Sequence, residues 1–345
     1  MRKSLKQSLS LLLALLMMLA LLAGCNSDNS EPATEPTEAA TEPTSPEPTN
    51  IRLAALKGPT TMGMAKLLDD NDNGLTQNHY DFTLTGTADE IVSGLIQGNL
   101  DAAAVPCNLA SVLYNRTEGG VQVAAINTLG VLYVVETGDT IHSVEDLRGK
   151  TIYSTGQGTT PEFSLNYILS ANGIDPATDV TVEFKSEATE IAALLAGADL
   201  GVAVLPQPYV TAAQKQNENL RVALNLSDEW DATEPENGSA MVTGVVLVRK
   251  EFAEQNKAAV DAFLNEYQAS VAYVNANVDE AAVLVAALDI TPEAIGKVAI
   301  PLCNIVFIDG DEMQSKVNGY LSVLFEQNPA SVGGTLPDES FYYKK

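Results

Sequence analysis

Short apolar runs alternate with amphipathic stretches along most of the chain after residue 50. In the first half the apolar runs are 51–56, 82–84 and 100–105. Between these runs, apolar residues recur at helical spacing. The same order returns in 151–153, 180–184 and 200–205. Short runs that are almost wholly apolar are typical of parallel strands covered by helices on both faces. The pattern therefore predicts two β-α-β-α-β units.

The two predicted units also resemble each other in sequence. Residues 88–106 and 188–206 are identical at seven of nineteen positions without a gap, and both segments end in a strand followed by proline. The shared residues are Ala88, Glu90, Ile91, Leu95, Leu100, Ala103 and Pro106. Ligands of open parallel sheets bind at the carboxyl ends of strands, where helix N-termini point. Pro106 and Pro206 therefore mark a candidate site.

The remaining patterns predict how the two units are joined. Runs 121–126 and 131–135 have strand character and lead from the first unit to the second, and 241–249 leads back. The later patterns are helical over 252–275, 279–288 and 312–325, with one strand at 305–308. We expect an α/β fold of two lobes, each a mainly parallel sheet flanked by helices, with the ligand cleft between them. The expected boundaries are 51–133 and 241–345 for the first lobe and 134–240 for the second.

The N-terminal segment predicts export. Three bases, Arg2, Lys3 and Lys6, precede the apolar run 9–22, which ends in small residues before Cys25. This is the pattern of a signal peptide over 1–24. If Cys25 carries acyl chains such as palmitate, it anchors the protein to a membrane; an ordinary signal peptide with a chance cysteine stays open. Residues 26–50 hold five prolines and six acids without a large apolar residue, which predicts a disordered tether.

Charge narrows the range of partners. The chain has 19 bases and 45 acids. Without three bases of the leader and six acids of the tether, residues 51–345 keep 16 bases and 39 acids, a net charge of −23. Such a body repels nucleic acid and anionic membrane surfaces. An anionic ligand would have to be attracted locally.

Motifs for catalysis, cofactors and metals are missing from the sequence. His79 and His142 lie near no serine, cysteine or acid at a motif spacing, and no G-x-S-x-G nucleophile elbow occurs. The acids at 69–72 lack the later glutamate of a calcium loop, so we expect a solvated acidic loop and no metal. For Cys107 and Cys303 we expect two buried free thiols, with a disulfide as the alternative.

The motifs in their order resemble the solute-binding proteins of ABC transporters. More narrowly, the chain resembles the sulfonate, nitrate and thiamine-pyrimidine group with the type II periplasmic binding fold. The segments that carry the resemblance are LAGC at 22–25, 98–106, DLRGK at 146–150, LPQPY at 205–209 and VLVRKEF at 246–252. The resemblance implies non-catalytic capture of a small molecule between two lobes and its delivery to an ABC permease and ATPase. It implies a monomer with no cofactor.

The resemblance also implies which residues contact ligand from the loops and crossovers. These are Lys57, Gly58, Thr60, Thr61, Asn108, Asn127, Thr128, Gln157, Thr159, Thr160, Gln207, Tyr209 and Thr243. For the loop residues the alternative is helix capping, and for those at the crossovers it is a hinge. Because the loops hold no arginine and Lys57 is their only cation, a monoanion or neutral heterocycle is favoured over a dianion. We also expect Asn108 and Gln207 to face each other across the cleft.

Three further points stay open at this level. Trp230, in the acidic segment 228–231, is expected to pack in a partly exposed loop, with stacking on a ligand as the alternative. Enzymes of the menaquinone route share the resembling fold, so a cytoplasmic enzyme is a rival reading, against which the export signal argues. A binding lipoprotein that feeds a sensor or adhesion system is another.

Overall fold

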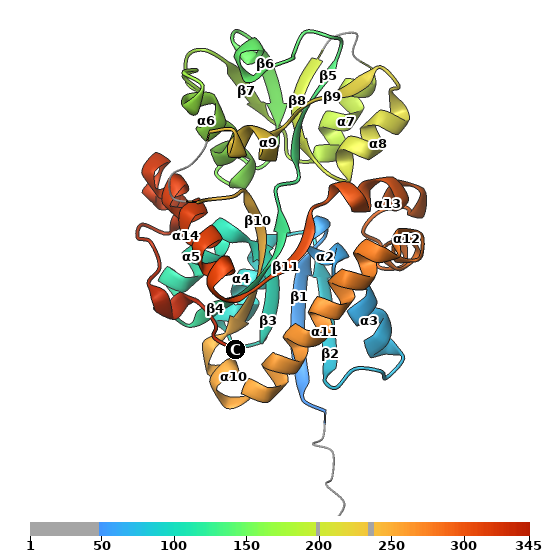
Figure 1. The fold of residues 1–345 in the computed structure, drawn as a ribbon, viewed down its shortest axis with the longest axis vertical. Helices are drawn as coiled ribbons and strands as arrows, with labels where there is room; N and C mark the ends of the chain where they lie inside the picture. The colour runs from blue at the N-terminus through green and yellow to red at the C-terminus, as the bar shows by residue number, and fades with distance from the viewer. Residues whose placement is uncertain (1–47, 198–200, 234–237) are drawn as a thin grey trace, which may run out of the picture. The chain divides into compact units, whose positions relative to one another are not determined.

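The computed structural model describes residues 48–197, 201–233 and 238–345, which form two sheets flanked by helices (Figure 1). This confirms the predicted α/β fold class. The signal peptide, Cys25 and nearly all of the tether lie outside the described residues, so they stay predictions. Among the described helices, none is both long enough and apolar enough to cross a membrane.

The first sheet has six strands in the order β11-β4-β10-β3-β1-β2. Their bounds are β1 Asn50–Leu56, β2 His79–Thr85, β3 Ala102–Pro106, β4 Val121–Leu129, β10 Val242–Arg249 and β11 Ile305–Ile308. Strands β2, β1 and β3 are parallel neighbours. Strand β10 runs antiparallel to both β3 and β4, and β11 runs antiparallel to β4.

The second sheet has five strands in the order β7-β6-β8-β5-β9. Their bounds are β5 Leu132–Thr137, β6 Thr151–Ser154, β7 Thr181–Phe184, β8 Gly201–Pro206 and β9 Leu220–Asn225. Here β7, β6 and β8 are parallel neighbours, and β5 runs antiparallel to β8 and β9. The order β7-β6-β8 matches β2-β1-β3, so the repeat seen in sequence is a repeat of topology.

The chain passes between the two sheets twice, and each passage adds one strand to the sheet that it enters. Strand β4 ends at Leu129 in the first sheet, and β5 begins at Leu132 in the second, paired with Pro206 at the carboxyl end of β8. On the return, β10 enters the first sheet with Gly244 opposite Pro106, at the carboxyl end of β3.

In each sheet four strands run in one direction, as expected for a mainly parallel sheet; the strands that run the other way are β10 and β11 in the first sheet and β5 in the second. A strand that arrives at the carboxyl ends of parallel strands must run back along them. The expected lobe boundaries at 133/134 and 240/241 lie close to these passages, and as domain boundaries they stay predictions.

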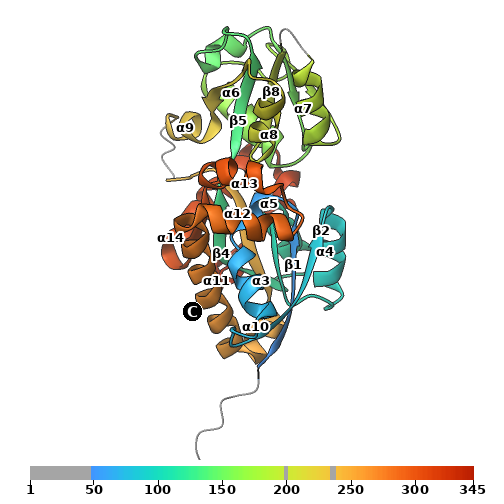
Figure 2. The same cartoon turned by 90° about the vertical axis from the view of Figure 1, so that its right-hand side faces the viewer.

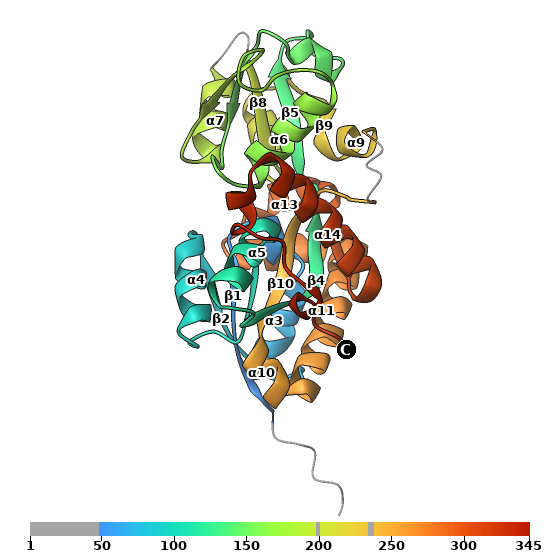
Figure 3. The same cartoon turned by 90° about the vertical axis from the view of Figure 1, so that its left-hand side faces the viewer.

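Helices cover both faces of the first sheet, as Figures 2 and 3 show from two sides. The helices that precede or follow its strands are α2 Pro59–Met62, α3 Ala65–Asp72, α4 Ala88–Ile96, α5 Cys107–Arg116, α10 Lys250–Gln255, α11 Lys257–Ala276, α12 Val278–Ala287, α13 Glu293–Ala299 and α14 Gly310–Gln327. Those of the second sheet are α6 Thr160–Ala171, α7 Ala188–Ala196, α8 Tyr209–Gln216 and α9 Leu226–Asp231. Short 3₁₀ turns occupy Val144–Leu147, Ile300–Leu302, Pro329–Val332 and Glu339–Phe341. The helix expected over 252–275 is two helices that meet at Asn256.

Strand alternation divides the core of the first sheet between its two faces. Ala103 and Val105 pack with α4, α5 and α14 on one face, while Ala102 and Ala104 pack with α3 and α11 on the other. The first of these clusters continues into the second sheet through Val134. The two sheets thus share one stretch of apolar core.

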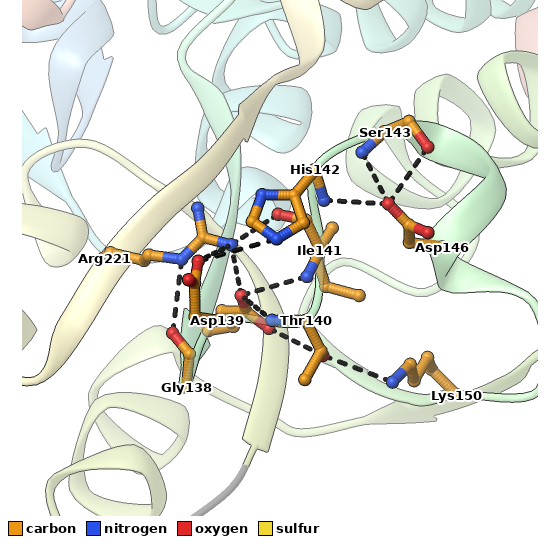
Figure 4. A network of polar contacts seen from close by, with 10 residues as sticks. Gly138, Asp139, Thr140, Ile141, His142, Ser143, Asp146, Lys150 and Arg221 are labelled. Carbon is orange, nitrogen blue, oxygen red and sulfur yellow. Dashed lines mark hydrogen bonds and ion pairs between the residues drawn. The ribbon is translucent and has the colours of Figure 1, made fainter.

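Figure 4 shows the polar network of the loop after β5, with Thr140, Ile141 and Arg221 among its members. The buried carboxylate of Glu136 organises this loop. Glu136 is 1% exposed and accepts hydrogen bonds from Thr140 N at 2.8 Å, Thr140 Oγ1 at 3.0 Å and Ile141 N at 3.0 Å. It also pairs with Arg221, whose guanidinium donates to the Ile141 carbonyl at 2.5 Å. Burial by itself raises the pKa of Glu136, but the hydrogen bonds from Ile141, Thr140 and Arg221 outweigh it and hold the pKa below its usual value. The ionised form is the one that the fold stabilises.

We predict that Glu136→Gln destabilises the protein by about 2 kcal/mol at pH 7, because it removes charge-assisted hydrogen bonds. A carboxyl group whose pKa is lowered by folding stabilises the fold above its unfolded pKa of about 4.3, and that contribution is lost as pH falls through the folded pKa. The difference from wild type should therefore shrink in acid. Urea unfolding at neutral and acidic pH measures this.

The matched control for this experiment is Glu293→Gln. The Glu293 carboxylate lies 2.8 Å from Lys297 on the helix surface, and both side chains are more than a third exposed. We expect a change within about 0.5 kcal/mol. Equal losses in the two variants, or a loss for Glu136→Gln that does not depend on pH, would contradict the role of the buried carboxylate.

Candidate functional site

The strand connections bring the carboxyl ends of the two sheets together. Helices α2 and α5 begin there in the first sheet, and α6 and α8 begin there in the second. Both crossing segments pass through the same region. The predicted ligand-binding residues all lie on these helix starts, on the loops before them or on the crossing strands.

In the first sheet, α2 forms a tight turn after β1. Gly58 has a φ of 145°, a conformation that only glycine adopts readily. Thr60 and Thr61 are buried, and both hydroxyls donate to the Leu56 carbonyl, at 3.3 and 2.5 Å. Lys57 Nζ lies 2.9 Å from Asp289 Oδ2. The one cation predicted for the site is therefore paired with an acid.

A hydrogen bond joins the two sheets between the first residues of α5 and α6. Thr160 Oγ1 donates to Asn108 Oδ1 at 3.3 Å, and Asn108 Nδ2 donates to the Ser331 carbonyl at 3.3 Å. Both Thr160 and Asn108 are buried. Nearby, the Ser164 and Tyr320 hydroxyls lie 3.3 Å apart. The start of α6 therefore contacts helices of the first sheet directly.

The remaining residues of the second sheet have local partners. Gln207 is 1% exposed, and its Oε1 accepts from Thr211 N at 3.3 Å and Thr211 Oγ1 at 2.9 Å within α8. These bonds do not test whether Asn108 and Gln207 face each other across the cleft, which stays a prediction. Thr159, exposed before α6, donates to the Gly156 carbonyl at 2.7 Å. Gln157 is also exposed, and Tyr209 is half-buried.

The crossing strands carry buried polar atoms without hydrogen-bond partners. Asn127 Nδ2 donates to the Thr60 carbonyl at 3.0 Å, but its Oδ1 has no partner. The hydroxyls of Thr128 and Thr243 also have none. Two residues outside the prediction join this group, Ser227 at the start of α9 and Tyr267 on α11. Of the seven such atoms in the described residues, five lie in this group; the others are on Thr137 and Arg249.

Buried polar groups are normally hydrogen-bonded, so each exception calls for an explanation. At the crossings the pairing of β4 and β10 is also irregular, with register shifts around Gly244. A ligand or a movement of the strands would supply partners. No pattern in the sequence marks Tyr267, because 140 residues separate it from Asn127; Ser227 precedes the return crossing closely enough to have been suspected.

Trp230 differs from its prediction. It lies on helix α9, not in a loop, and is 0% exposed. Its ring centroid lies 4.3 Å from that of Tyr167 and 5.4 Å from that of Tyr320, and its Nε1 donates to Ser239 Oγ at 3.1 Å. Helix periodicity turns the tryptophan inward while the acids around it stay at the surface. It packs between elements of the two sheets.

Both cysteines of the described chain are buried free thiols, as expected. Burial raises the pKa of Cys107, and it raises the pKa of Cys303 to about 12. Cys107 is 0% exposed and belongs to the apolar core. Its thiol, protonated at neutral pH, packs in the fold.

The expected acidic loop at 69–72 is the last turn of α3, where Lys66 pairs with Asp69 at 2.8 Å and with Asp70 at 2.7 Å. Within the described ranges, no group of three or more histidine, cysteine or acidic side chains has the geometry to hold a metal ion.

Three surface hollows of about 330 to 520 Å³ lie elsewhere in the fold. One is lined by the turns at 95–98 and 117–120, at the amino ends of β3 and β4, and the other two flank residues 342–344. No predicted ligand-binding residue lines any of the three. At the strand ends, Asn108 and Thr160 are in direct contact through their hydrogen bond.

Comparison with solved structures identifies the fold. An ABC transporter protein from Parabacteroides distasonis aligns with a TM-score of 0.72 and 23% identity, over 86% of this chain and 99% of the other. The periplasmic aliphatic sulphonate binding protein of Escherichia coli aligns with a TM-score of 0.67 and 14% identity, over 85% and 96%. The alkanesulfonate-binding protein from Xanthomonas axonopodis, bound to MOPS, aligns with a TM-score of 0.62 and 14% identity, over 85% of this chain and 96% of the other.

Comparison with curated proteins finds no match. The family model described as NMT1/THI5 like matches residues 108–281, just over half of the 345 residues. The match begins at Asn108, runs through both crossings and ends in α12. The chain therefore belongs to the NMT1/THI5-like family.

Proposed function

We propose that this protein is an extracytoplasmic solute-binding protein that captures a small polar or monoanionic organic molecule for import by an ABC transporter. The observation that carries the proposal is the meeting of two repeated sheets at their carboxyl ends, with unpartnered polar atoms on the strands that cross between them. Sulfonate-, nitrate- and pyrimidine-type molecules are the ligand classes considered. Solved structures with this fold include sulfonate-binding proteins, which supports the choice.

The energetics of the site favour a closing mechanism. Each helix N-terminus that faces a ligand contributes about 0.3 to 1 kcal/mol toward an anion or other acceptor. Micromolar affinity needs about 8 kcal/mol. Four helix starts fall short of that sum, so polar side chains and the approach of the two sheets must supply the rest.

Binding without turnover agrees with the chemistry of the described site. Its residues are threonine, asparagine, glutamine, glycine and Tyr209, with Ser227 and Tyr267 beside them, and its one lysine is paired with Asp289. Hydroxyls and amides bind through hydrogen bonds, but none of those described at the site forms an acid–base pair with a nucleophile. Conversion of a bound molecule by purified protein would favour the enzyme reading instead.

The lipid anchor belongs to the same proposal. Acylated Cys25 and the acidic, proline-rich tether would hold a monomeric binding protein at the outer face of the cell membrane, beside the permease and ATPase that it serves. The pattern in residues 1–50 supports this part of the proposal.

We expect protein purified from its own host to carry a small molecule that native mass spectrometry detects and identifies. Added back to stripped protein, this molecule should bring the two sheets closer, which solution scattering measures as a smaller radius of gyration. A protein that is empty after native purification, and whose scattering does not respond to candidate solutes, would contradict solute binding.

Gly244→Ala should weaken binding of that molecule by at least about tenfold, because overpacking displaces neighbouring side chains. A Cβ atom at Gly244 would lie 2.5 Å from Asn127 Oδ1 and 2.5 Å from Thr60 Cγ2, so both predicted contacts must move. The control is Gly197→Ala, where a Cβ meets no heavy atom within 4 Å. Calorimetry on both folded variants measures the affinities. Unchanged affinity in Gly244→Ala would show that the crossing strand at Gly244 is not part of the binding site.

Cys25→Ser should move the protein from the membrane fraction to the medium or periplasm, because the anchor depends on acylation of this thiol. Cell fractionation with immunodetection measures the distribution. Ser27→Ala, two residues away in the tether, should leave it unchanged. A Cys25→Ser protein that stays in the membrane fraction would show that the cysteine is not the anchor.

A further inference from the structure

The orientation of the Asn127 amide follows from its one hydrogen bond. A backbone carbonyl can only accept, so the side-chain atom 3.0 Å from the Thr60 carbonyl must be the amide nitrogen. The other end of the amide is then the oxygen Oδ1, an acceptor. Asn127 is 1% exposed, and this oxygen makes no hydrogen bond of acceptable geometry within the described residues.

The surroundings hold this acceptor at the meeting point of the predicted contacts. Oδ1 lies against Gly244 on β10 and beside the Thr60 methyl group, since a Cβ atom at Gly244 would approach both to 2.5 Å. The hydroxyls of Thr128 and Thr243 also lack partners. Hydroxyls can donate or accept, whereas Oδ1 can only accept. Only a hydrogen-bond donor, such as an N–H or O–H group of a ligand, can therefore satisfy this buried oxygen.

Attraction for an anion is weak at the same place. Lys57 is paired with Asp289, and the hydroxyls of Thr60 and Thr61 donate inward to Leu56. The first turns of α5 and α6, which have no side-chain cap, remain as donors for an acceptor group of a ligand. Within the described residues, the site thus combines an acceptor that lacks a donor with helix starts that can donate to a ligand, and its one lysine is paired with an acid.

We propose that Asn127 is a specificity-determining residue that selects an uncharged ligand bearing an N–H or O–H donor, and that it disfavours anions whose oxygens only accept. This inference rests on the proposed solute-binding function. Nitrate and alkanesulfonates would place an acceptor against Oδ1, whereas an uncharged molecule with a donor beside an acceptor matches both sides of the site.

Tyr267 is an internal residue that competes as a partner. Burial raises the pKa of Tyr267, and the neighbouring Asn127 side chain lowers it by a smaller amount. The two side chains are therefore close, but the Tyr267 hydroxyl makes no hydrogen bond of acceptable geometry. A Tyr267→Phe variant separates the two roles, because it removes the internal donor and leaves Asn127 in place.

The test compares four probes on the full chain after bound small molecules have been stripped. They are 4-aminopyrimidine at a mildly alkaline pH where it is uncharged, pyrimidine, ethanesulfonate and nitrate. The first two differ by one amino donor, and the last two are anions without a donor. Calorimetry and thermal shift should show aminopyrimidine binding about fivefold or more tighter than pyrimidine, and the two anions binding more weakly than aminopyrimidine.

The variants assign this preference to one side chain. Asn127→Leu should reduce the aminopyrimidine-to-pyrimidine ratio to about one. Asn275→Leu should keep it, although Asn275 also donates one hydrogen bond to a backbone carbonyl, that of Ile305 at 2.9 Å. Tyr267→Phe should also keep the ratio. Loss of the ratio in Tyr267→Phe would show that the tyrosine sets the preference.

The wild-type ranking decides the matter even if Asn127→Leu fails to fold. Tighter binding of ethanesulfonate or nitrate than of aminopyrimidine would overturn the inference and leave solute binding intact. If none of the four binds, the molecule that co-purifies from the host decides: an uncharged molecule with a donor supports the inference, and a donorless anion overturns it. Only a protein that is empty after native purification and binds no probe would overturn the proposed function as well.

Discussion

The pairing of β10 between β3 and β4 is the interaction on which the rest of the structure depends. It fills the middle of the first sheet with a strand that reaches it only after the chain has traversed the second sheet. Strand β5 does the same for the second sheet, between β8 and β9. Neither sheet is complete without the strand that the chain adds after crossing from the other sheet. The carboxyl ends of the strands in the two sheets are therefore held face to face. Such long-range pairing also raises the contact order of the fold, which slows folding.

This constraint explains why the polar residues of the crossings are left without partners. A strand that changes sheets leaves one ladder before it joins the next, and side chains at that point have no regular neighbours. Gly244 and Gly130 sit where a Cβ atom would strike Asn127 and Ser227, so the two passages pack closely against these side chains. The cost of burying an unpaired polar atom, about 1 to 3 kcal/mol, makes such a region responsive to any group that can supply a partner.

The two sides of the site are held differently. On one side, Trp230 packs between Tyr167 and Tyr320, and Gln327 Nε2 donates to the Phe163 carbonyl at 3.2 Å, so α14 links the first sheet to α6 and α9. On another, the Tyr133 hydroxyl donates to the Leu302 carbonyl at 3.0 Å. The aromatic contacts bury far more surface than a single hydroxyl bond. Movement of the two sheets would therefore disturb the Tyr133 side at lower cost than the Trp230 side.

The sequence by itself determined the strand order within each repeat, the burial of the strands and the position of the loops, because hydrophobic periodicity and turn residues are local signals. It also placed Asn127, Thr128 and Thr243 at the crossings, which the strand connections bear out. Only the tertiary structure decided which charged and polar side chains have partners within the fold. Pairing of Lys57 with Asp289 spans 232 residues, and the approach of Tyr267 to Asn127 spans 140. Trp230 likewise owed its burial to residues from α6 and α14, far away in the chain. Periodicity reports which face of an element is buried, but the partner that buries it, or that pairs with a charge, is chosen when distant segments meet.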